Sequence, residues 1–261
     1  MALRRSVVVG VVVCVAAVGG LSGCQGTAER GRAVHAASNP ANASRAASDD
    51  SLDGLTAPQI SRRMWDAMDT TSSMTLEFAG VLRAKPLQMK VAMTVKGTCA
   101  SAVRQEGWMM QVIRVDDGTA YIKGDAGYWT AMGAKGKTIG ELAGNRWIKF
   151  PSNSAPGRRL AGSCDLNTVL GRIKPNHAAS TKGGAGTVNG RPVVIIRQKE
   201  SSGTSTLSVA AKGKPYLLKI ASADAMTITF GAFDQPLHVT APPANQTIDL
   251  SLFGGDSGLD V

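Results

Sequence analysis

Residues 87–96 read LQMKVAMTVK, a run in which large apolar side chains alternate with small or polar ones. Successive side chains of a β-strand point to opposite faces of its sheet, so a period of two predicts a strand with one buried face. Such a strand is typical of an antiparallel sheet whose other face meets solvent. This run therefore restricts the chain to folds in which something covers one side of a sheet.

The same alternation recurs along much of the chain. Met74, Leu76 and Phe78 show it one strand earlier. Further strands are predicted at 107–115, 119–123, 127–131, 146–150, 191–199, 204–210, 215–222 and 226–232. Turn signals separate them: Asp116-Asp117-Gly118, Asn189-Gly190, Ser202-Gly203 and Lys212-Gly213. Many short strands joined by hairpins predict one large antiparallel sheet.

Two segments have helical character instead. Thr56 and Gln59 form a capping-box pattern, and the apolar residues after them recur at helical spacing, which predicts a helix at 57–70. A short amphipathic helix is predicted within 163–173, and a Gly- and Lys-rich loop at 176–186. We therefore expect a mainly β protein of the α+β class, in which a large curved antiparallel sheet wraps around two or three helices.

The first residues have the order of an export signal. Arg4 and Arg5 precede an uncharged, valine-rich run that ends in small residues and is shorter than the ~20 residues of a membrane span. The residues Leu21-Ser22-Gly23-Cys24 resemble the bacterial lipobox. That resemblance implies a signal peptide at 1–23 and a lipid anchor on Cys24, with acyl chains such as palmitate. An ordinary signal peptide that happens to contain a cysteine is the alternative.

Of the four cysteines, Cys14 leaves with the leader and Cys24 takes the lipid, so Cys99 and Cys164 remain. Thiols in an exported protein tend to pair, and one pairing is possible, so we predict a Cys99–Cys164 disulfide. Two buried free thiols are the alternative. A metal site is disfavoured because no CxxC motif or histidine partner lies near either cysteine.

Composition divides the rest of the chain. Residues 25–52 hold few large apolar side chains, so 24–52 is predicted to be the lipidated cysteine and a disordered tether. The folded domain is expected at 53–250, and a flexible tail at 251–261.

No pattern supports catalysis. Gly255-Asp256-Ser257-Gly258 matches the loop around a serine nucleophile, but no histidine has a motif context suited to a general base. The run KGGAG at 182–186 resembles a phosphate loop, but no predicted helix follows it. We therefore predict a protein that is not an enzyme and holds neither metal nor cofactor.

The chain has a formal net charge of +10, and its basic residues concentrate between Gly133 and Lys182. Nine lie there against two acids: Lys135, Lys137, Arg146, Lys149, Arg158, Arg159, Arg172, Lys174 and Lys182. Nucleic acid is disfavoured as a partner because no stacking aromatics interleave with them. Attraction to anionic lipid head groups fits better, and a solvated face with no partner remains the alternative.

Several segments together resemble the actinobacterial LppX/LprG-type lipoproteins, which share the fold of the LolA/LolB carriers. The resemblance rests on VNGRPVV at 188–194, GKPYLLKI at 213–220 and FGAFDQPLHVTAPP at 230–243, with the lipobox and tether. It implies a half-barrel sheet around helices that encloses a hydrophobic cavity for acyl chains. By periodicity, the expected wall residues are Met89, Met93, Trp108, Met110, Val112, Leu218, Ile220, Ile228 and Phe230, and each fits a plain core as well.

The sequence thus predicts a lipoprotein held on the extracytoplasmic face of the cell membrane. Its expected function is to bind acyl chains of lipids or glycolipids, as a carrier or chaperone of the cell envelope. The alternative is a non-enzymatic envelope interaction or sensor lipoprotein with a closed core. A sizeable apolar void distinguishes the first from the second.

Overall fold

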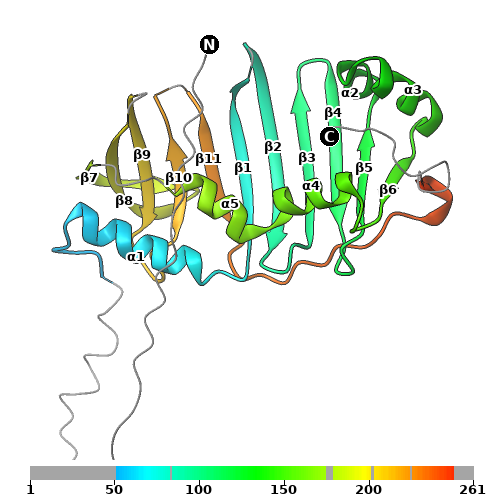
Figure 1. The fold of residues 1–261 in the computed structure, drawn as a ribbon. Coiled ribbons are helices and arrows are strands. Elements are labelled where there is room, and N and C mark those ends of the chain that lie inside the picture. The colour runs from blue at the N-terminus through cyan, green and yellow to red at the C-terminus, as the bar shows by residue number, and fades with distance from the viewer. Residues whose placement is uncertain (1–50, 83, 175–178, 201–202, 224, 250–261) are drawn as a thin grey trace, which may run out of the picture. The chain divides into compact units, whose positions relative to one another are not determined.

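Strands dominate the computed structural model, which describes residues 51–249 except 83, 175–178, 201–202 and 224 (Figure 1). The expected signal peptide, Cys24, nearly all of the expected tether and the tail at 251–261 lie outside the described residues. In the described part, twelve strands form one sheet in the order β12-β6-β5-β4-β3-β2-β1-β11-β10-β9-β8-β7.

The first half of the sheet is a run of six strands. They are β1 (Ser73–Leu82), β2 (Lys85–Thr94), β3 (Cys99–Gln105), β4 (Trp108–Arg114), β5 (Ala120–Gly124) and β6 (Trp147–Phe150). The second half holds β7 (Ala179–Val188), β8 (Arg191–Glu200), β9 (Gly203–Ala210), β10 (Leu217–Ala221) and β11 (Thr227–Gly231). Antiparallel pairing of β1 with β11 joins the two halves.

The short strand β12 (Thr247–Asp249) follows a 3₁₀ turn at Ala244–Gln246 and pairs with β6 in parallel. The sheet is therefore mixed: the large antiparallel sheet expected from the sequence carries one parallel pair at its β12 edge. Lys149 on β6 and Asp249 on β12 form an ion pair at 3.1 Å, and Asp249 raises the pKa of Lys149.

Five α-helices are described, more than the two or three expected. They are α1 (Ala57–Asp69), α2 (Ala126–Ala131), α3 (Gly133–Ala143), α4 (Ala155–Cys164) and α5 (Leu166–Ile173). Helices α1, α5 and α4 follow one another across one face of the sheet, whereas α2 and α3 gather at the β4–β6 end (Figure 1). Lys174 links α5 to α1, since its Nζ lies 2.9 Å from Asp69 Oδ2 and 5.6 Å from the Trp65 ring centroid.

Local signals located several elements correctly. Helix α1 begins after Thr56, whose backbone N–H donates to Gln59 Oε1 at 2.9 Å. The Asn189-Gly190 turn joins β7 to β8 with positive φ at both residues, as a two-residue hairpin of this kind requires.

Two segments were assigned wrongly. The strand predicted at 127–131 is helix α2, because Asp125 Oδ1 accepts a hydrogen bond from the Tyr128 N–H at 2.8 Å and starts a helix there. The loop predicted at 176–186 largely belongs to β7, where pairing with β8 satisfies the backbone whatever the side chains are. The short helix predicted within 163–173 is confirmed as α5, which begins at Leu166 because Asp165 is extended and caps it through the Thr168 N–H.

The core lies between the sheet and the helices that cross it. Its largest fully buried side chains come from both layers: Ile60, Met64 and Met68 on α1, Leu166 on α5, and Met74, Met93, Ile122, Ile148, Val193, Ile196, Leu217 and Leu218 on strands or next to them. Each buried aliphatic side chain of this kind stabilises the fold by roughly 1.5–3 kcal/mol relative to exposure.

A polar clasp fixes the chain after β11 to the start of β1. Asp234 donates its N–H to Ser73 O at 2.9 Å and accepts the Ser72 N–H at 2.8 Å. The Tyr216 hydroxyl donates to Asp234 Oδ2 at 2.5 Å. The Tyr216 hydroxyl and the Ser72 N–H together hold the pKa of Asp234 below its usual range.

We expect Asp234→Asn to lower the free energy of unfolding by about 1 kcal/mol near pH 7. The folded pKa of Asp234 lies below its unfolded value, so its charged form stabilises the fold above roughly pH 4 and that contribution is lost as pH falls through the folded pKa. The difference between wild type and variant should therefore shrink between pH 6 and pH 3 in urea unfolding. Asp66→Asn on exposed α1 surface is the control, and an unchanged difference at both pH values would contradict the clasp.

Candidate functional site

The helix-facing side of β1–β4 and β11 presents apolar side chains in cross-strand rows. One row runs Ile228, Phe78, Met89, Val103, Met110, and the next runs Phe230, Leu76, Val91, Ser101, Val112. Alternation along each strand places these residues on one face.

Ser101 is the smallest side chain of the second row. It pairs with Val91 on β2 and with Val112 on β4, so the row dips at β3. A hydroxymethyl group fills less space than the valines on either side, and Ser101 lines a pocket together with residues of α4 and α5. The sheet therefore contributes a hollow at this point.

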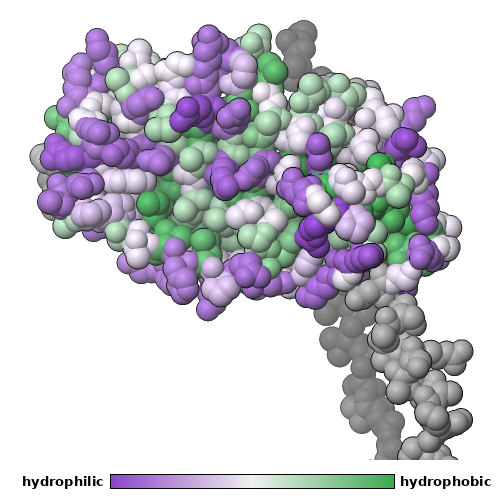
Figure 2. Space-filling model, turned by 180° about the vertical axis from the view of Figure 1, so that it is seen from behind, coloured by the Kyte–Doolittle hydropathy of each residue, from purple (hydrophilic) through white to green (hydrophobic). Residues whose placement is uncertain are grey.

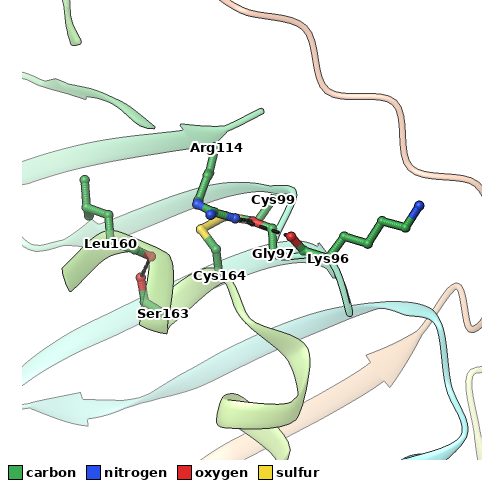
Figure 3. The surroundings of a disulfide bond; sticks show 7 residues. All are labelled: Lys96, Gly97, Cys99, Arg114, Leu160, Ser163 and Cys164. Carbon is green, nitrogen blue, oxygen red and sulfur yellow. Dashed lines mark hydrogen bonds between the residues drawn. A yellow bond between two sulfur atoms is a disulfide. The ribbon is translucent and has the colours of Figure 1, made fainter. Parts of the chain in front are cut away.

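Helices α4 and α5 form the opposite wall. Leu160, Ser163 and Cys164 come from α4, and Val169, Arg172 and Ile173 come from α5. Ser163 Oγ donates back to Leu160 O at 2.8 Å, so its hydroxyl is already used within α4 (Figure 3).

The pocket between these walls has a volume of about 360 Å³. Apolar side chains dominate its lining, which comprises Leu76, Phe78, Met89, Val91, Met93, Ser101, Val103, Met110, Val112, Leu160, Ser163, Cys164, Val169, Arg172, Ile173 and Ile228. Its size falls in the range of small-molecule sites, and such a lining favours apolar ligands.

A disulfide attaches the helical wall to the sheet. The sulfur atoms of Cys99 on β3 and Cys164 on α4 are bonded, as predicted from the sequence, with their Cα atoms 5.4 Å apart (Figure 3). Arg114 lies beside the bond and donates to Gly97 O at 2.7 Å. The linkage fixes α4 over the pocket at the point where Cys164 lines it.

Five of the nine wall residues named from the sequence line this pocket: Met89, Met93, Met110, Val112 and Ile228. The other four do not line it. The centroid of the Trp108 ring lies 5.6 Å from that of the Tyr128 ring on α2. Leu218 and Ile220 are buried on β10, against which α1 packs. Phe230 pairs with Leu76 and is 3% exposed.

These four differ because alternation identifies the face of a strand but not which helix covers it. The sequence reasoning also missed Val103, Ser101, Leu160 and Ser163, since neither β3 nor α4 was predicted. The apolar spacing of Val169 and Ile173 within the predicted amphipathic helix was the signal that did point to the pocket.

The opposite face of the sheet is more polar. Figure 2 shows it with hydrophilic side chains spread over much of it and smaller apolar areas between them. A hollow of about 450 Å³ on the strands β1–β4 and β11 is lined partly by Glu77, Lys90 and Arg104, and Lys90 pairs with Glu77 at 2.7 Å. An apolar chain would bring these charges out of water there, so the helix-covered pocket suits it better.

The nine basic residues of 133–182 do not act as one free patch. Lys149 and Lys174 form ion pairs, Lys182 donates to the carbonyls of Leu52 and Leu55, and Arg146 donates to those of Leu142 and Ala143. Arg158 donates to Asn153 O. Only Lys135, Lys137 and Arg172 lack a hydrogen bond or ion pair to another described residue, and Arg172 alone of these lines the apolar pocket.

The structure bears on only some of the catalytic motifs weighed from the sequence. Residues 255–258 and His177 lie outside the described residues, and the supposed phosphate loop at 182–186 is strand, not loop. Within the described ranges, no three His, Cys, Asp or Glu side chains gather as metal ligands would. No helix of the described residues is long and apolar enough to cross a membrane.

Comparison with known proteins finds distant structural likenesses. No family model matches the chain, and no curated protein matches it. Several solved structures do match the chain. LppX is among them: this Mycobacterium tuberculosis lipoprotein is 13% identical with a TM-score of 0.40, over 70% of this chain and 99% of that one.

Two further solved structures resemble the chain at a similarly low level. MucB is 18% identical with a TM-score of 0.34, over 73% of this chain and 61% of that one. A Vibrio parahaemolyticus domain assigned to outer membrane lipoprotein sorting is 8% identical with a TM-score of 0.22, over 69% of this chain and 93% of that one. The family named from the sequence is thus represented among the neighbours, but likeness at this level says nothing of what this chain binds.

Proposed function

We propose that this protein is a non-catalytic lipid-binding lipoprotein that shelters an acyl chain of a lipid or glycolipid in the pocket under α4 and α5. The observation that supports this is an apolar void of about 360 Å³ between sheet and helices. A protein-interaction lipoprotein with a closed core, the alternative, has no need of such a void. Each methylene moved from water into the pocket contributes about 0.8 kcal/mol, so a chain of ten carbons contributes about 8 kcal/mol, which exceeds the lower estimates of the cost of association.

The location of the protein is part of the same proposal. A lipid anchor on Cys24 would hold the domain at the extracytoplasmic face of the cell membrane, where its cargo is found. Two or more acyl chains on that cysteine are needed for stable attachment. In this position the protein would act as a carrier or chaperone of the envelope.

Filling the pocket tests the proposal. Ser101→Leu adds a large apolar side chain where the sheet dips, so it should raise the Kd for dodecanoate at least tenfold while the fold is retained. Ala102→Leu is the matched control, because Ala102 is the next residue of β3 and is exposed on the opposite face. Binding would be measured by calorimetry below the micellar concentration, on the full chain with Cys24→Ala, so that no attached acyl group competes.

Circular dichroism and urea unfolding would establish that both variants fold. A folded Ser101→Leu protein that binds dodecanoate as tightly as wild type would show that the chain does not enter this pocket. Absence of any binding by wild type, to single- or double-chain lipids, would favour the closed interaction domain instead.

A further inference from the structure

The pocket has a definite capacity. A methylene group occupies about 27 Å³ in a close-packed apolar interior. A volume of about 360 Å³ therefore accommodates roughly 13 methylenes, which is one acyl chain of medium length. That volume does not hold a second chain of the same length beside the first.

The lining also has one charged group. Arg172 is the single charged side chain among the described residues that line the pocket, and it is exposed on the last turn of α5. Its guanidinium has no hydrogen bond or ion pair to another described residue. A charge in this position can reach both water and the end of a bound chain.

We infer that the pocket takes a single-chain anionic amphiphile, with a chain of roughly 12–14 carbons under α4 and α5 and its anionic head group paired with Arg172. This rests on the proposed function and narrows its ligand from lipids in general to one chain with one anionic group. Guanidinium binds carboxylate and phosphate oxygens through paired N–H donors, so both head groups share the chemistry that Arg172 recognises.

Arg172 has a structural alternative, because a basic side chain in the last turn of a helix also stabilises the helix dipole. The two roles differ in what they affect. A dipole role changes the stability of the protein with any ligand or none. A head-group role changes the affinity for anionic ligands and leaves that for neutral ones unaltered.

The chain-length experiment uses saturated carboxylates from eight to eighteen carbons, titrated into the full chain with Cys24→Ala by calorimetry. Affinity should rise roughly fourfold per methylene and level off near 13 carbons. Two-chain phosphatidylglycerol should bind no more tightly than the one-chain lysophosphatidylglycerol with the same acyl group. A continued rise to eighteen carbons, or much tighter binding of the two-chain lipid, would overturn the single-chain inference and leave the proposed function intact.

The head-group experiment uses Arg172→Gln, with Lys135→Gln as the control for loss of one exposed positive charge. Arg172→Gln should raise the Kd for dodecanoate and dodecyl phosphate about tenfold and leave that for neutral dodecyl maltoside within about twofold. Dependence on Arg172 for one anion alone would identify carboxylate or phosphate as the natural head group. Equal weakening of all three ligands, or of none, would overturn the role of Arg172, whereas no binding of any probe to wild type would refute the proposed function itself.

Discussion

Replacing both Cys99 and Cys164 with alanine should lower the free energy of unfolding by about 4 kcal/mol. The disulfide closes a loop of 65 residues, and in the loop-closure account the lost cross-link returns about this much entropy to the unfolded chain. Both cysteines are buried, at 0% and 2% exposure. Alanine is therefore preferred to serine, whose hydroxyl group would be buried without a hydrogen-bond partner.

Urea unfolding of the oxidised wild type and of the double variant would measure this difference. Dithiothreitol supplies the control, since it should destabilise the wild type to a similar extent and leave the variant unchanged. We also expect weaker dodecanoate binding by the variant, because Cys164 fixes α4 where it lines the pocket. A difference under about 1 kcal/mol, with no response to dithiothreitol, would mean that the thiols are not paired.

Trp129→Ala should lower the free energy of unfolding by about 3–5 kcal/mol, which is the second large effect that we expect. Trp129 is 2% exposed and anchors α2 to the end of the sheet, where its Nε1–H donates to Gly124 O at 3.0 Å. Its ring packs on the bare backbone of α3, since a Cβ on Gly140 would lie 2.6 Å from Trp129 Cβ. Truncation would remove a large buried surface and leave the Gly124 carbonyl without its donor.

Two further variants separate these contributions. Trp129→Phe keeps most of the packing and loses the hydrogen bond, so it should cost about 1–2 kcal/mol. Thr130→Ala, at the exposed neighbouring position, should change stability by less than about 0.5 kcal/mol. Urea unfolding would provide all three values, and a Trp129→Ala protein within about 1 kcal/mol of wild type would contradict this anchoring role.

Trp129 also illustrates a limit of local prediction. The aromatic and β-branched residues of 127–131 favour a strand by composition, yet they form α2. The decisive group is Asp125, which accepts the Tyr128 N–H with one carboxylate oxygen and the Met109 N–H with the other, at 2.8 Å each. Met109 is distant in sequence, so only the folded arrangement of β4 against this turn explains the helix.

Strands without an apolar period were missed for a related reason. Strand β3 reads CASAVRQ and β7 reads ASTKGGAGTV, and neither has large alternating side chains. Their hydrogen bonds come from neighbouring strands that are themselves well specified. In β7 glycine also leaves room for its neighbour, since a Cβ on Gly183 would lie only 3.0 Å from Ile195 Cγ2 and Ile195 would have to shift.

The candidate site divides in the same way. Met89, Met93, Met110, Val112 and Ile228 were predictable as wall residues because they alternate on strongly periodic strands. Ser101 and Leu160 were not, since the elements that carry them were not predicted. Arg172 was one of nine basic residues that the sequence singled out between 133 and 182. Only the structure shows that it lines the pocket, whereas most of the others bind partners elsewhere.

The sequence by itself determined which segments have a buried face, where hairpins turn, where α1 begins and which two cysteines pair, because these depend on local periodicity, local hydrogen bonds and the number of available thiols. The tertiary structure alone decided that β1 pairs with β11, that α4 and α5 leave a void above Ser101, and that Arg172 stands at its wall. The reason is physical: a void is the space left between elements that are far apart in the chain. A local sequence pattern reports only on neighbouring residues, so it cannot show where distant elements do not make contact.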